Sequence, residues 1–220
     1  MLVMESFIDS LEKVAPIRLR EPLAETLGAL AVKNAVLDYR FIDAVKMAGH
    51  ACPTVAAAYL ICQSALEKLY PKEIPVRGDI EVIVYGEPDE GVYGVMAQVI
   101  TFITGAAPAT GFKGLGTRFK RKDLLRFNPG GEESGAMRFD FRRIDTNRAV
   151  AARYYPGRVP FPEEKSRQLA HLMQPVIWGA ASDDEKDTFQ KLWMEKVEDM
   201  LIERKEIDRW LKLELKEVSK

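Results

Sequence analysis

The sequence is poor in the residue types that make an enzyme class easy to recognise. Its 220 residues include two cysteines and two histidines, and its 32 lysines and arginines nearly balance 33 aspartates and glutamates. Two cysteines provide no disulfide framework, and a net charge of −1 argues against a general nucleic-acid binder. A phosphate loop, a Gly-x-Ser-x-Gly turn and a Cys-x-x-Cys pair are also absent. These absences argue against several common classes of enzyme.

Long apolar runs are missing as well. No apolar run reaches the ~18 residues that a helix needs to span a bilayer. The N-terminus carries Glu5, Asp9 and Glu12, where a signal peptide would have basic residues and then a long apolar core. We therefore expect a cytoplasmic protein that does not associate with membranes. The length suits one large domain, or one domain with a helical appendage.

One histidine and one cysteine meet in residues 48–54, which read A-G-H-A-C-P-T. Pro53 suits the first turn of a helix, so Cys52 is expected at or next to the N-cap. The unpaired N–H groups and the helix dipole favour a thiolate there. His50 and Cys52 are therefore candidate ligands of zinc or another divalent transition metal. Alternatively, Cys52 is a catalytic nucleophile coupled to the imidazole of His50.

Each of these residues also has an ordinary structural interpretation. A free cysteine often packs as a small hydrophobic residue, and a histidine before a helix can simply form a hydrogen bond. His-x-Cys is a short and common pattern, and two ligands do not complete a zinc site. We assign Cys62 to packing in the core, and His171 to a packed or surface position within a helix.

The periodicity of apolar residues predicts an α+β fold, with a small mixed or antiparallel sheet packed against helices. Residues 1–155 are expected to form the α+β core with its N-terminal helices, and residues 156–220 a helical C-terminal extension. The predicted helices are 6–15, 22–39, 41–47, 55–70, 93–103, 145–155, 163–176 and 182–204. The predicted strands are 79–85 and a hairpin that joins 124–127 to 135–142.

Positive charge gathers just after a glycine-containing loop at residues 106–116. Such a run is usually a solvated face, but it also suits an anionic small molecule or an acidic partner. The candidates for ligand binding are Lys113, Arg118 and Lys120, and the rest of the cluster comprises Arg121, Lys122 and Arg126.

The order of these features resembles FmdE, a family of proteins associated with formylmethanofuran dehydrogenase, over roughly residues 41–145. His50-Ala-Cys52-Pro53 opens an alanine-rich helix, and a strand, an acidic loop, an apolar helix and Thr104-Gly105 follow. The resemblance implies an α+β core, a homodimer, and zinc bound at histidine and cysteine positions. By this resemblance, His50 and Cys52 are the candidate zinc ligands. It does not imply formylmethanofuran chemistry, since FmdE is not expected to hold the catalytic molybdenum or tungsten centre.

The sequence also departs from the family pattern, which usually reads His-Gly-His-x-Cys-Pro-Gly. Ala48 replaces the first histidine, and Thr54 replaces the last glycine. Val95 and Gln98 stand where a cysteine and an aspartate are expected, and Ala106 stands where another cysteine is expected. The C-terminal part contains no cysteine, whereas some members carry a cysteine-rich zinc module there. The chain therefore looks like a divergent member with a reduced or altered site.

Three functions remain open at this point. The first is a metal-binding accessory protein, whose further ligands come from Glu87, Asp89, Glu90, water or a second copy of the chain. The second is an enzyme that uses Cys52 as an activated thiol, with the basic region 118–126 receiving an anionic substrate. The third is a non-catalytic dimeric interaction module, whose helical end binds a partner such as a redox enzyme.

Overall fold

The computed structural model describes residues 7, 9–29, 35–130 and 134–216, and its centre is a five-stranded sheet. The strand order is β6 (Leu125–Phe127), β3 (Ile80–Tyr85), β7 (Met137–Arg143), β8 (Ala149–Tyr154) and β9 (Leu211–Lys216). β3 pairs with β6 in parallel, and the other neighbours pair antiparallel. The sheet is therefore mixed, and the predicted α+β class is confirmed.

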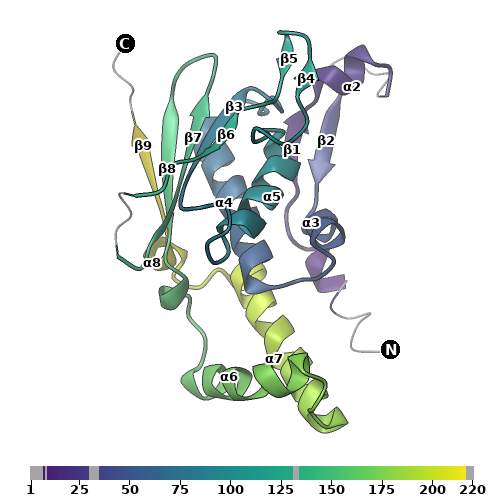
Figure 1. Cartoon of the computed structure of the whole chain (residues 1–220), viewed down its shortest axis with the longest axis vertical. Helices are drawn as coiled ribbons and strands as arrows, with labels where there is room; N and C mark the ends of the chain where they lie inside the picture. Colours follow the sequence, from purple (N-terminus) through teal and green to yellow (C-terminus); the bar gives the residue numbers. More distant parts are fainter. Residues whose placement is uncertain (1–6, 8, 30–34, 131–133, 217–220) are drawn as a thin grey trace.

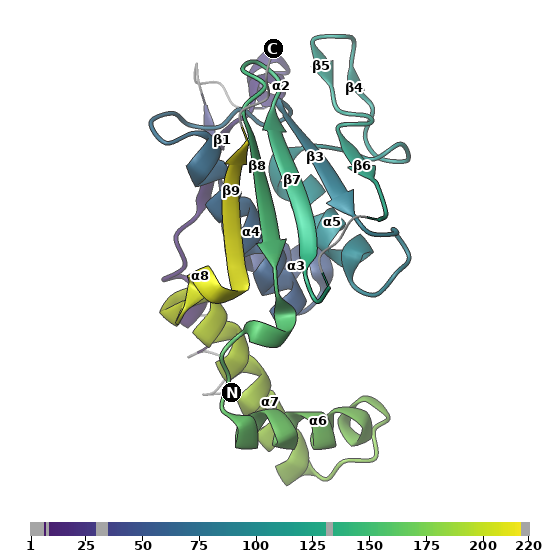
Figure 2. The ribbon, with the colours of Figure 1, turned by 90° about the vertical axis from the view of Figure 1, so that its left-hand side faces the viewer.

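Two helices, α4 (Pro53–Leu69) and α5 (Tyr93–Thr104), cover one face of this sheet (Figure 2). β3 and β7 alternate between buried and partly exposed residues, so each presents one apolar row to the helices. α4 is buried almost all round, because α5 and α3 (Phe41–Ala48) pack against its other sides. The predicted central helix is confirmed, and Cys62 lies within it at 0% exposure.

The N-terminal part differs from the predicted pair of helices. In the described residues, helix covers Phe7 and Asp9–Leu11, while Ser6 and Ile8 of the first predicted helix lie outside the described residues. The predicted helix over residues 22–39 is wrong. α2 (Pro22–Thr26) ends before Gly28, and Leu30 and Asn34 lie outside the described residues. β2 (Val36–Tyr39) instead pairs antiparallel with β1 (Ile17–Arg20).

Two predictions about the sheet are wrong. The segments of the predicted hairpin, β6 and β7, do not pair with each other, because β3 lies between them. The predicted helix over residues 145–155 is mostly β8, which forms a hairpin with β7 through Asn147 at φ 58°. Neighbours on both edges bury nearly all of β8, so its sequence lacks the alternation that marks a half-buried strand.

The C-terminal part begins as predicted and then returns to the core. After the turn η1 (Pro156–Arg158), helices α6 (Glu163–Ile177) and α7 (Asp183–Glu198) form an arm at the end of the molecule opposite β4 and β5 (Figure 1). The predicted capping box of Ser182 and Glu185 opens α7. A π-helical turn, η2 (Asp199–Glu203), and α8 (Ile207–Trp210) follow. The extension is not helical throughout, because β9 pairs with β8.

Across the described ranges, every helix is too short or too polar to cross a membrane.

Candidate functional site

Cys52 is the N-cap of α4, as the sequence predicts. Its backbone is extended, at φ −153° and ψ 165°, and Pro53 takes the first helical position. The Val55 N–H donates a hydrogen bond to the Cys52 sulfur over 3.4 Å. The cysteine is 7% exposed. Its sulfur therefore acts as a capping acceptor in the first turn of α4.

His50 lies on the surface just after α3, which ends at Gly49 with φ 77°. Its ring Nδ1 is 3.0 Å from the carbonyl oxygen of Ala48. A carbonyl oxygen can only accept, so Nδ1 carries the proton of this hydrogen bond. In the neutral ring, Nε2 is then left as an acceptor. Metal-ligating histidines are commonly held in this way through the other ring nitrogen.

A tryptophan from the C-terminal arm contacts the loop between these two residues. Nε1 of Trp193, on α7, donates a hydrogen bond of 2.9 Å to the carbonyl oxygen of Ala51. The indole stacks on Phe189, with ring centroids 5.4 Å apart. The sequence contained no signal for this contact.

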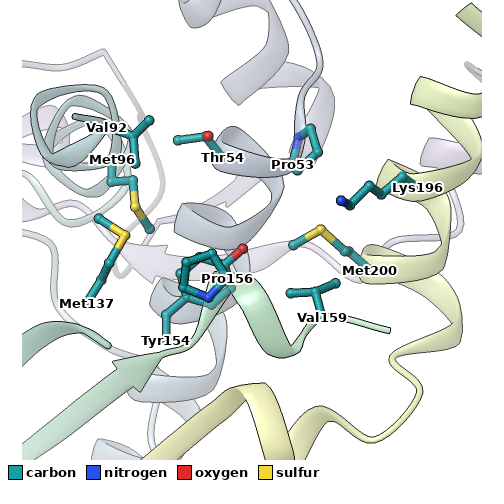
Figure 3. Close-up of a pocket in the computed structure, with 10 residues that line it drawn as sticks. All are labelled: Pro53, Thr54, Val92, Met96, Met137, Tyr154, Pro156, Val159, Lys196 and Met200. Carbon is teal, nitrogen blue, oxygen red and sulfur yellow. The ribbon is translucent and has the colours of Figure 1, made fainter. Parts of the chain in front are cut away.

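A cavity of about 150 Å³ lies beside the start of α4 (Figure 3). Apolar side chains dominate its wall, including three methionines, and among the described residues Lys196 is the one charged side chain that lines it. Burial lowers the pKa of Lys196. Burial also raises the pKa of Tyr154, and the nearby Cys52 raises it further. The remaining lining residues are Pro53, Thr54, Val92, Met96, Met137, Pro156, Val159 and Met200.

The acidic candidates do not complete a metal site with His50 and Cys52. Glu87, Asp89 and Glu90 are exposed in the loop before α5. In the part of the chain that the structure describes, no three histidine, cysteine, aspartate or glutamate residues form a group that could hold a metal. Each of the two predicted ligands has a suitable donor atom, but the described residues supply too few donors for tetrahedral zinc.

The basic candidates lie in a different place. Arg118 and Lys120 line a second cavity of about 250 Å³, together with Arg121. Lys113 is exposed and does not line it, although its carbonyl oxygen accepts a hydrogen bond from the Arg121 N–H.

The two cavities lie at opposite ends of α5. Val92 and Met96, at its start, line the first cavity. At its end, the carbonyl oxygen of Thr104 accepts a hydrogen bond from the N–H of Gly78, which lines the second cavity. The helix has 12 residues and is about 18 Å long. The basic region therefore does not sit over Cys52, as the thiol-enzyme hypothesis requires.

Comparison with known families gives one match. A family model described as "FmdE, Molybdenum formylmethanofuran dehydrogenase operon" matches residues 47–207. The matched segment contains His50, Cys52, every residue that lines the first cavity, and Trp193 on the arm. It extends the resemblance seen at residues 41–145 well into the C-terminal part. No curated protein matches the chain.

Proposed function

The chain belongs to the FmdE family, and from that membership we propose that it is a metal-binding accessory protein. His50 and Cys52 would each supply one ligand to a divalent transition metal, with zinc as the first candidate. The observation that carries the proposal is the hydrogen bond from His50 Nδ1 to Ala48, which leaves Nε2 as the donor atom for a metal. Two residues later, the Cys52 sulfur, an atom of the kind that zinc binds, accepts the Val55 N–H at the start of α4.

The other ligands would come from outside the chain. We propose that a second copy supplies another His50 and Cys52, because two such pairs make the Cys₂His₂ set common in structural zinc sites. The exposed position of His50 suits such sharing. Since Cys52 is 7% exposed, the loop around Ala51 has to move before the sulfur reaches a shared metal. With four protein ligands, the metal would have a structural role in linking two chains. A catalytic metal would instead need an open coordination position.

A non-catalytic interaction module is the second candidate. It is favoured by the exposure of two large apolar residues at the end of α6, Ile177 at 69% and Trp178 at 74%. Exposed aromatic residues of this kind are enriched at protein interfaces. Under this candidate the arm binds a partner protein, and His50 and Cys52 have structural roles only.

Metal content distinguishes these two candidates. We would measure zinc, iron and nickel by mass spectrometry in untagged protein and in the His50→Ala/Cys52→Ala variant, with molar mass from light scattering. The matched control is His171→Ala/Cys62→Ala, which removes the other histidine and cysteine. A shared site predicts about half a metal per chain in a dimer. It also predicts loss of metal from the first variant and retention in the control.

Two results would contradict the metal proposal. One is parent protein without metal after purification with zinc, iron and nickel supplied. The other is equal metal content in the parent and the His50→Ala/Cys52→Ala variant. Either result, with an intact dimer, would favour the interaction module.

A further inference from the structure

The second cavity, at the end of α5 and remote from Cys52, is surrounded by positive charge. It has a volume of about 250 Å³, which suits a small molecule rather than a polymer. Of the residues that the structure describes, one acidic side chain, Asp79, lines it. Five basic residues line it, namely Arg20, Arg77, Arg118, Lys120 and Arg121.

Beneath this cavity two guanidinium groups share the hydrogen bonds of one carboxylate, and Asp79 adds an electrostatic attraction to Arg121. Glu21, which is 5% exposed, accepts hydrogen bonds from Arg77 Nη1 over 2.8 Å and from Arg121 Nη2 over 2.7 Å. One buried carboxylate thus serves two guanidinium groups. A charge in a low-dielectric interior is costly when its counter-charge is incomplete, so an additional anion nearby is favoured.

Arg121 carries most of this imbalance. Its side chain is 3% exposed, and its Nε and Nη1 atoms have no hydrogen-bond partner among the described residues. Arg77 differs, because its Nε and Nη2 donate to the carbonyl oxygens of Ile103 and Phe102. Burial lowers the pKa of Arg121, and Glu21 opposes that shift. Buried nitrogens without partners are uncommon, and these two leave part of the Arg121 charge uncompensated beneath the cavity.

The backbone leaves room for this guanidinium. A Cβ atom built on Gly78 would lie 1.6 Å from Arg121 Nη1, and one on Gly105 would lie 2.7 Å from it. Both glycines have positive φ angles, 91° and 72°, which other residues rarely adopt. The Arg121 guanidinium therefore packs against two separate turns, each of which has a glycine at the point of contact.

The rim adds two cations that can touch a ligand directly. Arg118 and Lys120 are exposed and belong to the hairpin of β4 (Gly114–Leu115) and β5 (Phe119–Lys120). Neither forms an ion pair with a carboxylate in the part of the chain that the structure describes. The Arg118 guanidinium lies over the Phe119 ring, 5.0 Å from its centroid.

We propose that this cavity binds a small multivalent oxyanion, with the chemistry shared by phosphate monoesters and dicarboxylates. Arg118 and Lys120 hold the anion at the rim, and Arg121 supplies positive charge from below. Guanidinium groups match paired oxygens in geometry, and charge-assisted hydrogen bonds are the stronger kind. The site stands independently of the proposed metal site, because it shares no residue with it.

Calorimetric titration of the full chain tests this proposal with two probes, sodium phosphate and sodium succinate, at constant ionic strength set with chloride. The cavity variant is Arg118→Gln/Lys120→Gln, whose residues are exposed and make no ion pair with any described residue. The matched control is Arg167→Gln/Lys186→Gln, which removes two exposed or partly exposed cations from the arm. We expect saturable binding at one anion per chain, weakened ~10-fold or more by the cavity variant and unchanged by the control.

The outcomes separate the two sources of the oxyanion. Saturation by phosphate alone assigns a phosphate-bearing ligand, and saturation by succinate alone assigns a dicarboxylate. Equal affinity of the parent and the cavity variant would overturn the site, as would the absence of saturable binding of both probes through the millimolar range. Metal content plays no part in this readout, so failure here is distinct from failure of the metal proposal.

Discussion

Trp193 and Ala51 are joined by a hydrogen bond of 2.9 Å from the indole Nε1 to the carbonyl oxygen, although 142 residues separate them. Ala51 lies between His50 and Cys52, and Trp193 lies on the C-terminal arm. The arm therefore contacts the backbone of the loop that carries both candidate ligands.

Removing the indole N–H should loosen this loop. Trp193→Phe keeps an aromatic ring but leaves a partly buried carbonyl without its donor, so we expect the free energy of unfolding to fall by ~1 kcal/mol. Urea denaturation measures the change. Trp178→Phe is the control, because Trp178 is 74% exposed and its substitution should stay within ~0.5 kcal/mol. Equal losses in the two variants would show that the hydrogen bond to Ala51 contributes nothing.

Two substitutions at Cys52 separate capping from metal binding. Serine is a good N-cap residue, so metal-free Cys52→Ser should match the parent, whereas Cys52→Ala should lose ~1 kcal/mol. A serine hydroxyl is a poor ligand for zinc, so both variants should lose the gain in melting temperature that metal gives the parent. Melting curves with and without metal make the comparison. Full metal content in Cys52→Ser would rule out the sulfur as a ligand.

The Cys62 thiol should be inert in the folded protein. It is 0% exposed, and burial raises its pKa, which suppresses the reactive thiolate. In the Cys52→Ser variant, where Cys62 is the remaining thiol, a thiol reagent should label nothing in buffer and one group in urea. Rapid labelling of that variant in buffer would place Cys62 outside the core.

Gly78→Ala should destabilise the protein more than Gly28→Ala. Both glycines have positive φ angles, 91° and 75°, so both variants carry the same kind of backbone strain. A Cβ at Gly28 meets nothing within 4 Å, whereas one at Gly78 would displace Arg121 from Glu21. We expect Gly78→Ala to cost at least ~1 kcal/mol more in urea denaturation. Similar costs would mean that the guanidinium relocates freely.

Asp145 should contribute stability that is lost in acid. Arg143 donates two hydrogen bonds to it, over 3.0 and 2.7 Å, and holds its pKa below the usual 3.8. Because the folded pKa is lower than the unfolded one, the contribution is complete above about pH 4 and disappears as the pH falls through the folded pKa. Asp145→Asn should therefore lower the melting temperature at pH 7, with the difference shrinking below pH 4. A difference independent of pH would contradict this assignment.

Features that depend on neighbouring residues were predicted well. The Cys52 cap, the start of α4 at Pro53 and the Ser182 capping box each rest on interactions within one helical turn. The strand before the acidic loop and the apolar helix after it also follow from local pattern. The site prediction was local in the same sense, since it selected two donors that are close in sequence.

The sequence by itself therefore determined the class of the fold, its central helix, the position of Cys52 and the resemblance to the FmdE family. Only the tertiary structure decided that residues 36–39 and 211–216 are strands, because their partners, β1 and β8, lie elsewhere in the chain. It also decided that residues 149–154 are a strand, which β7 and β9 flank. It also brought Arg121 to Glu21 across 100 residues and Trp193 to Ala51 across 142. Pairing of strands and burial of charge depend on which segments meet in space. The residue pattern of one segment does not indicate which other segment it will contact.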